Sequence, residues 1–347
     1  MKAAINGFVL GALCALGMGI AIPVLAHAKL TEVSSKEKTG HVAGFVKLAT
    51  GNEIYIDYIK PAPGKPIAVL LNGLTYKVDS WDAFVGDLKG DGLGILRYDM
   101  QGQGETLLKY APITAIIPLQ NQVDDLKNLL DALQIQQPVH LVTLSYGGAV
   151  GIPFTAQNPD RVASLILMAP FVAPLPSQDD WIKSQINETR LAFPANPASD
   201  DDLYNYFLQM LVFGTYPAAE PVVLENPYIL ESIFHIVQGV RQFEAKDYIS
   251  ALPPGKVHLM VARNDQYVPA ALHEAFWQAL PKEDQASRLF IENSEHKIPE
   301  AVPSFSAAWV RQIMNGDPRI SGGVTFEGSP ADHKATAGSL IIDNLGD

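Results

Sequence analysis

Short, wholly apolar segments recur along this chain, and most are followed by a polar loop and then by residues with helical periodicity. A strand that is apolar on both faces must be covered on both faces, and strands that alternate with helices build a parallel sheet between two helical layers. The pattern therefore predicts an α/β protein, and 347 residues are enough chain for a sizeable core. The segments typical of buried strands are residues 65–73, 94–100, 138–144, 163–170, 256–262 and 287–292. Helical spacing is found in residues 119–135, 147–157, 270–280 and 302–314.

Three stretches depart from this alternation. Residues 41–60 alternate around a turn at Gly51, which predicts a hairpin and brings the expected sheet to about eight strands. Residues 171–254 are too long for a crossover and contain several helical patterns, so we expect a helical cap inserted after the sixth strand. The tail, residues 316–347, is rich in Gly, Ser and Asp, and we expect a loosely ordered extension with at most a short strand at Ser339–Ile342. The expected core then comprises residues 41–170 and 255–315.

The N-terminus has the order of a bacterial secretory signal: Lys2, an apolar run over residues 8–25, and a small-residue cleavage site that ends at Ala28. We therefore expect residues 1–28 to be removed, residues 29–40 to form a linker, and the mature protein to be periplasmic or secreted without a stable membrane anchor. The alternative is an uncleaved anchor in the inner membrane through residues 8–25, since about 18 apolar residues can just span a bilayer.

Cysteine content and net charge exclude several kinds of site and partner. The only cysteine, Cys14, lies in the expected signal, so the mature chain has no disulfide, no thiolate zinc site and no cysteine nucleophile. The formal net charge is -12 and no cluster of Lys and Arg is present, which argues against a nucleic-acid partner and against an anionic membrane surface. A small-molecule substrate fits this composition.

Ser145 stands between the apolar segment 138–144 and the glycine pair Gly147–Gly148. A serine at a strand-to-helix turn projects its hydroxyl group out of the sheet, and the first helical N–H, here that of Tyr146, is free to bind an oxyanion. The plainer alternative is a serine that merely caps the helix. Asp265 and His296 favour the nucleophile, because each follows a buried strand, and serine, acid, histidine is the order expected of a triad on a parallel sheet.

These residues resemble the α/β-hydrolase fold family over about residues 44–314. The resemblance also includes Asn72-Gly73, the turn "YDMQGQGET" and the segment "NPDRVASLILMAP". It implies a serine hydrolase with Ser145 as nucleophile, His296 as base and Asp265 as the group that orients the base. It further implies an oxyanion hole made of the backbone N–H groups of Leu74 and Tyr146.

The chain departs from the family pattern at three positions. Thr143 stands at the first position of the serine turn, where the family usually has glycine; Asn72 replaces a usual histidine, and Gln101 replaces a usual arginine. Thr143 adds bulk at the turn, whereas the other two change the hydrogen bonding around the site. None of them removes a catalytic group.

Alternatives for the acid come from the cap, where Asp179 and Asp180 are candidates, but Asp265 lies in the better loop. Among the eight histidines, only His296 follows a strand in the right loop. We expect Asp99, in a glycine-rich turn, to anchor that turn. No metal-ligand spacing and no dinucleotide-binding fingerprint is present, so no cofactor is expected.

The leading hypothesis is an exported serine hydrolase that cleaves carboxylic esters through an acyl-enzyme. A second is an aminopeptidase or amidase similar to proline iminopeptidases, which would need carboxylates to hold a substrate ammonium. The cap offers Glu188, Asp200, Asp201 and Asp202 for this role. A third is a cofactor-free haloperoxidase-like enzyme or a ligand-binding protein, because a fold and a triad do not fix the reaction.

Overall fold

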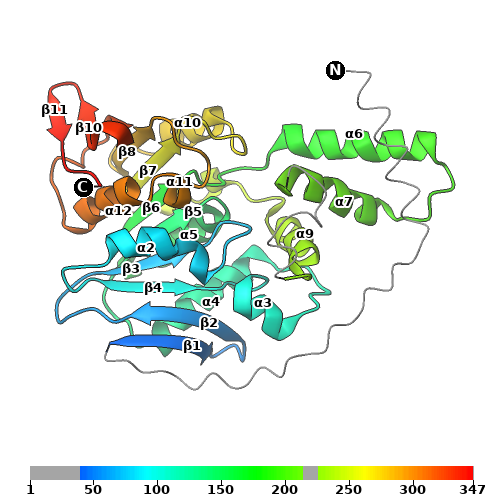
Figure 1. Cartoon of the computed structure of the whole chain (residues 1–347), viewed down its shortest axis with the longest axis horizontal. Helices are drawn as coiled ribbons and strands as arrows, with labels where there is room; N and C mark the ends of the chain where they lie inside the picture. The colour runs from blue at the N-terminus through cyan, green and yellow to red at the C-terminus, as the bar shows by residue number, and fades with distance from the viewer. Residues whose placement is uncertain (1–39, 214–225, 347) are drawn as a thin grey trace. The chain divides into compact units, whose positions relative to one another are not determined.

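The computed structural model describes residues 40–213 and 226–346, and the expected signal peptide and nearly all of the expected linker lie outside them. Strands and helices alternate from β3 to β9 (Figure 1). The strands are β1 His41–Lys47, β2 Glu53–Ile59, β3 Ile67–Leu71, β4 Gly94–Tyr98, β5 Val139–Leu144, β6 Val162–Met168, β7 Val257–Ala262, β8 Gln285–Ile291, β9 Val324–Ser329, β10 Lys334–Ala337 and β11 Leu340–Ile342. The helices are α2 Asp82–Leu88, α3 Gly104–Tyr110, α4 Leu119–Ala132, α5 Tyr146–Gln157, α6 Pro176–Ala192, α7 Asp200–Phe213, α9 Ile229–Val240, α10 Ala270–Ala279, α11 Ile298–Ala301 and α12 Pro303–Met314.

All strands join one sheet in the order β1-β2-β4-β3-β5-β6-β7-β8-β9-β10-β11. The pairings from β4 to β9 are parallel, and the outer strands at both ends pair antiparallel. The expected α/β-hydrolase architecture is therefore confirmed, but the sheet has 11 strands instead of about eight.

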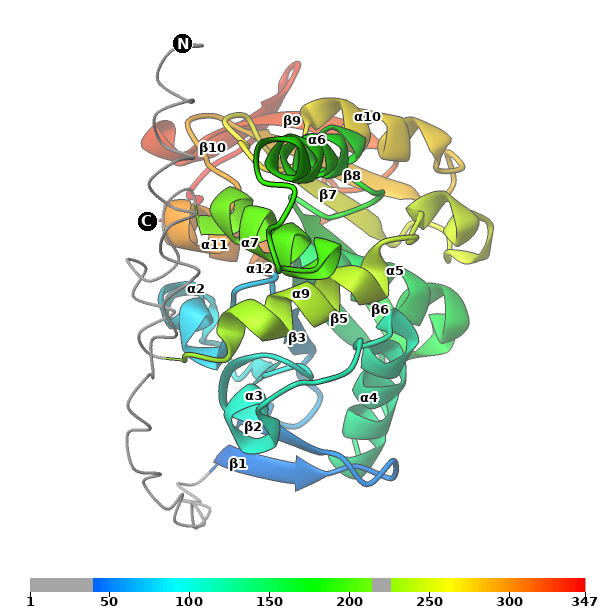
Figure 2. The same ribbon diagram turned by 90° about the vertical axis from the view of Figure 1, so that its right-hand side faces the viewer.

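Helices cover both faces of the sheet (Figure 2). Side chains alternate between the faces: Leu141 of β5 packs in the core beneath α4 and α5, while its neighbour Val142 packs in the core beneath α2 and α12. This alternation explains why the central strands are apolar throughout.

The tail corrects the expectation of a loosely ordered extension. Strand β9 pairs in parallel with β8, and β10 and β11 continue the sheet as a meander. Phe326 of β9 is wholly buried and its ring packs edge-on against Trp309 of α12. The tail is thus part of the core layer.

Between β6 and β7 the chain forms α6, α7 and α9, which lie to one side of the sheet (Figures 1 and 2). These helices share a small apolar core, which contains Ile182, Leu203, Phe207 and Ile233 and also Leu107 of α3. We call α6, α7 and α9 the cap. Tyr216, an aromatic residue of the same segment, lies outside the described residues.

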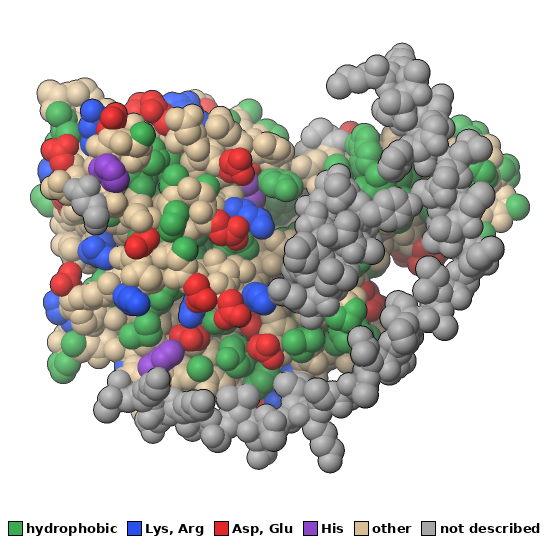
Figure 3. Space-filling model, viewed as in Figure 1, with side chains coloured by type: hydrophobic (Ala, Val, Ile, Leu, Met, Phe, Trp, Pro, Cys, Tyr) green, Lys and Arg blue, Asp and Glu red, His purple; other side chains and the backbone are tan. Residues whose placement is uncertain are grey.

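Acidic and basic side chains are interspersed over the face shown in Figure 3. None of the helices in residues 40–213 and 226–346 has the length and hydrophobicity of a membrane span.

Candidate active site

Ser145 forms the sharp turn between β5 and α5. Its backbone has φ 49° and ψ -112°, a conformation that costs a residue other than glycine on the order of 1–3 kcal/mol. The N–H of Ser145 donates to the carbonyl oxygen of Met168 at 3.0 Å, and its own carbonyl accepts the N–H of Gly148 at 2.8 Å and that of Phe171 at 2.9 Å. Backbone hydrogen bonds on both sides therefore hold the strained turn in place.

Gly147 and Gly148 let α5 start very close to the sheet. A Cβ at position 147 would lie 2.4 Å from the carbonyl oxygen of Leu71, and one at position 148 would lie 2.7 Å from Cβ of Pro170. Neither position has room for a side chain, so the glycine pair is a packing requirement of the serine turn.

Thr143, which departs from the family pattern, is wholly buried. Its Oγ1 donates to the Ile166 carbonyl oxygen at 3.3 Å. Its methyl group points at Gly151 of α5, where a Cβ would lie only 2.8 Å from Thr143 Cγ2. The side chain of Thr143 therefore fits because residue 151 of α5 is a glycine.

Asp265 and His296 lie in the loops after β7 and β8 and contact each other directly. The distance from His296 Nδ1 to Asp265 Oδ2 is 2.8 Å, and Asp265 Oδ1 accepts the N–H groups of Tyr267 and Val268 at 2.8 and 2.9 Å. Burial acts to raise the pKa of Asp265, but its hydrogen bonds, led by the one from His296, outweigh burial and hold that pKa below its ordinary value. An ionised carboxylate only accepts, so Nδ1 carries the proton and Nε2 of His296 is left as the basic nitrogen.

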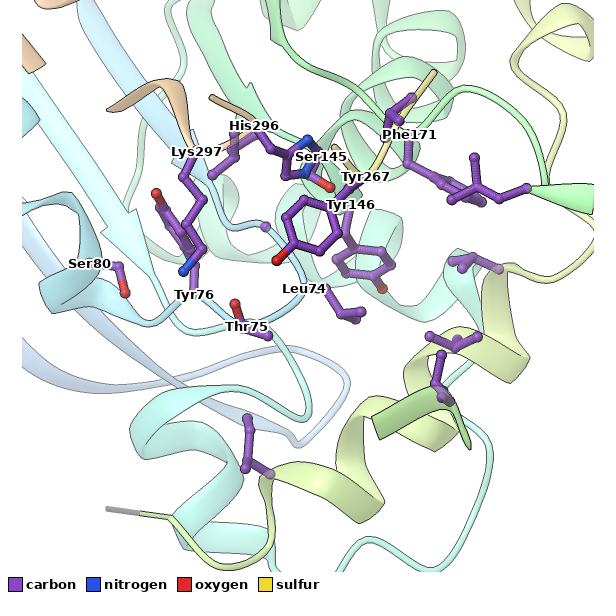
Figure 4. A pocket seen from close by; sticks show the side chains of 18 of the residues that line it. Leu74, Thr75, Tyr76, Ser80, Ser145, Tyr146, Phe171, Tyr267, His296 and Lys297 are labelled. Atoms are coloured by element: carbon purple, nitrogen blue, oxygen red, sulfur yellow. The ribbon is translucent and has the colours of Figure 1, made fainter. Parts of the chain in front are cut away.

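Ser145 and His296 line the same cavity, which has a volume of about 820 Å³. Figure 4 shows both side chains on one wall of the cavity, with Leu74 and Tyr146 nearby. Asp265 does not line the cavity; its side chain is 2% exposed and lies behind the histidine. The structure therefore brings together all five residues that the sequence singled out for the site.

The backbone N–H groups of Leu74 and Tyr146 have no hydrogen-bond partner within the described residues. Tyr146 is the first residue of α5, where the N–H groups of a helix have no partner inside the helix. Both residues line the cavity beside Ser145. Two unpaired donors next to a serine hydroxyl can stabilise an oxyanion.

Buried amides fix the loop that carries Leu74. Asn72, in place of the family's usual histidine, donates to the Tyr98 carbonyl oxygen at 3.1 Å and accepts the indole N–H of Trp81 at 2.7 Å. Gln103 donates from Nε2 to the carbonyl oxygens of Gly73 at 2.8 Å and Leu74 at 3.3 Å. Sequence reasoning missed Gln103; its only signal was a polar residue inside a glycine-rich turn.

Asp99 anchors this glycine-rich turn, as expected. Its carboxylate accepts the N–H groups of Val78 at 2.7 Å and Glu105 at 2.8 Å. A Cβ at Gly104 would lie 2.1 Å from Asp99 Oδ2, so only glycine fits there. Burial raises the pKa of Asp99 to about 6.

Gln101, the third departure from the family pattern, hydrogen-bonds outside the cavity. Its side chain donates to Asp125. The side chain of Gln122 accepts the Gln101 N–H at 3.2 Å and donates to the Gln101 carbonyl oxygen at 2.9 Å. Gln101 therefore fastens the turn to α4.

The cap supplies the apolar wall of the cavity. The cap residues that line it include Ile182, Leu208, Ile229, Val237 and Val240. On the opposite side, polar residues gather, and Figure 4 shows Thr75, Ser80 and Lys297 there. The lining thus includes a group of apolar cap side chains and, on the opposite side, a group of polar side chains.

The cap carboxylates considered for the site either have other partners or do not line the cavity. Asp179 pairs with Lys183 and with Arg241, so it is not a partner of His296. Asp200 pairs with Arg190, and Asp202 accepts from Ser199 at the start of α7. None of the carboxylates considered for substrate binding, Glu188, Asp200, Asp201 and Asp202, lines the cavity.

The model of the family described as "Serine aminopeptidase, S33" matches residues 62–300. The chain belongs to the S33 family of α/β hydrolases.

Among the curated proteins, this S33 member is similar to a putative carbamate hydrolase RutD of Variovorax paradoxus (strain S110). The identity is 32% over 108 residues, which is 31% of this chain and 39% of that protein. The chain spans less than half the length of the curated relatives it matches.

Solved structures with the same fold cover most of the S33 chain. An esterase from Thermogutta terrifontis, with malate bound, has a TM-score of 0.56 and 20% identity over 79% of this chain and 98% of its own. MGS-M2, an α/β hydrolase from a Medee basin deep-sea metagenome library, has a TM-score of 0.58 and 22% identity over 78% of this chain and 97% of its own. At these identities the likeness shows the fold alone.

Within the described part of the S33 chain, no three His, Cys, Asp or Glu side chains lie close enough together to hold a metal ion.

Proposed function

We propose that this S33 member is an exported serine hydrolase that cleaves carboxylic esters through an acyl-enzyme intermediate. The observation that carries the proposal is the hydrogen bond of 2.8 Å between His296 Nδ1 and Asp265, formed at the wall of the cavity that also contains Ser145. A base held in one tautomer, next to a serine at a strained turn, is what nucleophilic acyl transfer requires.

The reaction begins when Oγ of Ser145 attacks the ester carbonyl carbon and its proton passes to Nε2 of His296. The carbonyl oxygen becomes an oxyanion and accepts the N–H groups of Leu74 and Tyr146. The bond to the leaving alcohol then breaks, and His296 returns the proton to the alcohol oxygen. Water repeats the sequence on the acyl-enzyme and releases the carboxylic acid and the free serine.

The apolar cap side chains in the lining, among them Ile182, Leu208 and Val240, support an ester with an apolar acyl group, because they offer no hydrogen bonds. Esterases also occur among the proteins that share this fold. The test is Ser145→Ala in the mature protein, with fluorophosphonate labelling and turnover of short acyl esters as readouts. Ser80→Ala is the matched control, since Ser80 lines the same cavity. We expect labelling and turnover to vanish only in Ser145→Ala; labelling that survives in that variant would contradict the proposal.

One observation favours an aminopeptidase as a second candidate. Among the described residues, three carboxylates line the cavity, those of Glu105, Asp179 and Glu300, and the last two have cationic partners. Within the described residues, the carboxylate of Glu105 has none, so it is available to a substrate ammonium. A panel of acyl esters and amino-acid arylamides separates the two candidates, and Glu105→Gln should reduce turnover of the arylamides alone if this second candidate holds.

Export is proposed from the N-terminal residues: the apolar run 8–25 followed by small residues up to Ala28. N-terminal sequencing of the protein from a periplasmic fraction should begin at Lys29. Recovery of the uncleaved chain in the membrane fraction would support the anchored alternative instead.

A further inference from the structure

His273 is a buried histidine beside the site that the proposed mechanism does not use. It lies on α10, is 1% exposed, and its Nε2 is 3.0 Å from the carbonyl oxygen of Pro170. A carbonyl oxygen only accepts, so Nε2 carries the proton and donates it to Pro170. Nδ1 is buried and has no partner within the described residues.

The peptide group that accepts from His273 also donates to the serine turn. The carbonyl of Pro170 and the N–H of Phe171 belong to one planar peptide unit, and that N–H donates to the Ser145 carbonyl oxygen at 2.9 Å. His273, the peptide unit and Ser145 therefore form a continuous chain of two hydrogen bonds. Because the unit is rigid, fixing its oxygen also fixes the direction of its N–H.

Two residues at this connection have strained backbone conformations. Ser145 has φ 49° and Ala169, the residue before Pro170, has φ 42°. Such conformations persist only where the surroundings hold them. The Pro170 ring also packs against Gly148 at the start of α5, because a Cβ at Gly148 would lie 2.7 Å from Pro170 Cβ. A shift of the peptide unit would therefore move the serine turn.

From this geometry, and on the basis of the proposed function, we infer that His273 is a positioning residue. It orients the Pro170–Phe171 peptide unit so that Ser145 keeps the backbone conformation needed for attack. The connection also ties the serine turn to α10, which directly follows the Asp265 loop. It therefore links the turn that carries Ser145 to the loop that carries Asp265.

His258 provides a matched comparison. It is also a buried histidine with one side-chain hydrogen bond, from Nδ1 to Ser287 Oγ at 2.8 Å. It lies near the start of β7, and it does not line the cavity. A purely structural role for buried histidines would make His273→Leu and His258→Leu equivalent in their effects.

The test compares four variants of the mature protein. His273→Leu removes the donor; His273→Gln places an N–H near the position of Nε2; His273→Asn is polar but too short to reach Pro170; His258→Leu is the control. For each variant the melting temperature, kcat and KM on a short acyl ester, and the rate of fluorophosphonate labelling of Ser145 are measured.

We expect His273→Leu and His273→Asn to lower kcat and the labelling rate on the order of 10-fold or more with KM nearly unchanged. His273→Gln should recover most of the loss, and His258→Leu should lower the melting temperature but keep kcat. Wild-type kcat in His273→Leu, or equal activity of the Gln and Asn variants, would overturn the positioning role. If His273→Leu does not fold, the Gln and Asn pair decides. Absence of labelling in the wild-type protein would instead refute the proposed function.

Discussion

The methyl group of Thr143 occupies the space that a side chain at Gly151 would need, with Cγ2 only 2.8 Å from where the Cβ would stand. One residue lies on the strand that enters the serine turn and the other on the helix that leaves it. The two positions therefore compensate each other, and this relationship explains how the turn tolerates a threonine.

This compensation predicts a non-additive pair of variants. Gly151→Ala should destabilise the protein by about 1–3 kcal/mol, because the new methyl group overlaps that of Thr143. Thr143→Ser keeps the hydroxyl group and removes the methyl group, so Thr143→Ser with Gly151→Ala should regain most of the loss. Urea unfolding of the single and double variants measures the coupling. Additive losses would show that the two side chains do not share the space. Thr143→Gly should leave the protein active.

Asp265→Asn should lower kcat on esters roughly 10³–10⁴-fold with little change in KM, because an amide no longer fixes the proton on Nδ1 of His296. The lowered pKa of Asp265 also sets a pH dependence. Its stabilising contribution is present above the ordinary Asp pKa of about 3.9 and is lost as the pH falls through the lower folded-state value. Undiminished activity of the Asp265→Asn variant would point to a different acid.

Gln103→Leu should lower kcat about 10-fold, because the loop that carries the Leu74 N–H loses the hydrogen bonds to Gly73 and Leu74. Gln285 is a matched control: it is buried and donates to the carbonyl oxygens of Trp277 and Leu280 at 3.0 Å, away from the cavity. Gln285→Leu should reduce the melting temperature and keep kcat. Equal kcat values in the two variants would contradict the role given to Gln103.

His140 and His258 predict sensitivity to acid. Burial lowers the pKa of His140 to about 4 and that of His258 to about 3. The unfolded chain therefore binds protons below about pH 6.5 while the folded chain does not, so stability falls as the pH decreases toward 4. At about 1.4 kcal/mol per pKa unit, His140 alone accounts for about 3 kcal/mol. Replacing both histidines by asparagine should reduce this loss of stability. Urea unfolding between about pH 7 and pH 4.5 measures the free energy of unfolding as a function of pH. An unchanged pH dependence in the double variant would assign the loss to other groups.

Much of the core could be predicted because the central strands are apolar throughout. Ser145, Asp265 and His296 could be singled out as candidates because each follows such a strand in the sequence. By contrast, β9 contains Gly328, which makes the segment resemble a loop. Its glycine is a packing requirement, since a Cβ there would lie 2.9 Å from the ring of Phe305. A contact with a distant helix cannot be seen in local sequence pattern.

The residues that hold the loops of the site in place could not be predicted from the sequence, for a related reason. Gln103 acts on the backbone of a loop about 30 residues earlier in the chain, and His273 acts on the backbone of Pro170, 103 residues away. Side chains that hold backbone groups leave no periodic signal in the sequence. Their partners become known only when the fold has brought them together.

The strands that follow α12 also cover one of the two edges of the sheet. Without β9, the edge of the sheet would be β8, a seven-residue strand that leads directly into the His296 loop. An exposed edge of that length is open to pairing with a strand from another molecule. On this side the edge is instead β11, which has three residues and is too short to pair well with a strand from another molecule. A chain truncated after Met314 is therefore expected to aggregate, even though it would retain every residue of the proposed catalytic machinery.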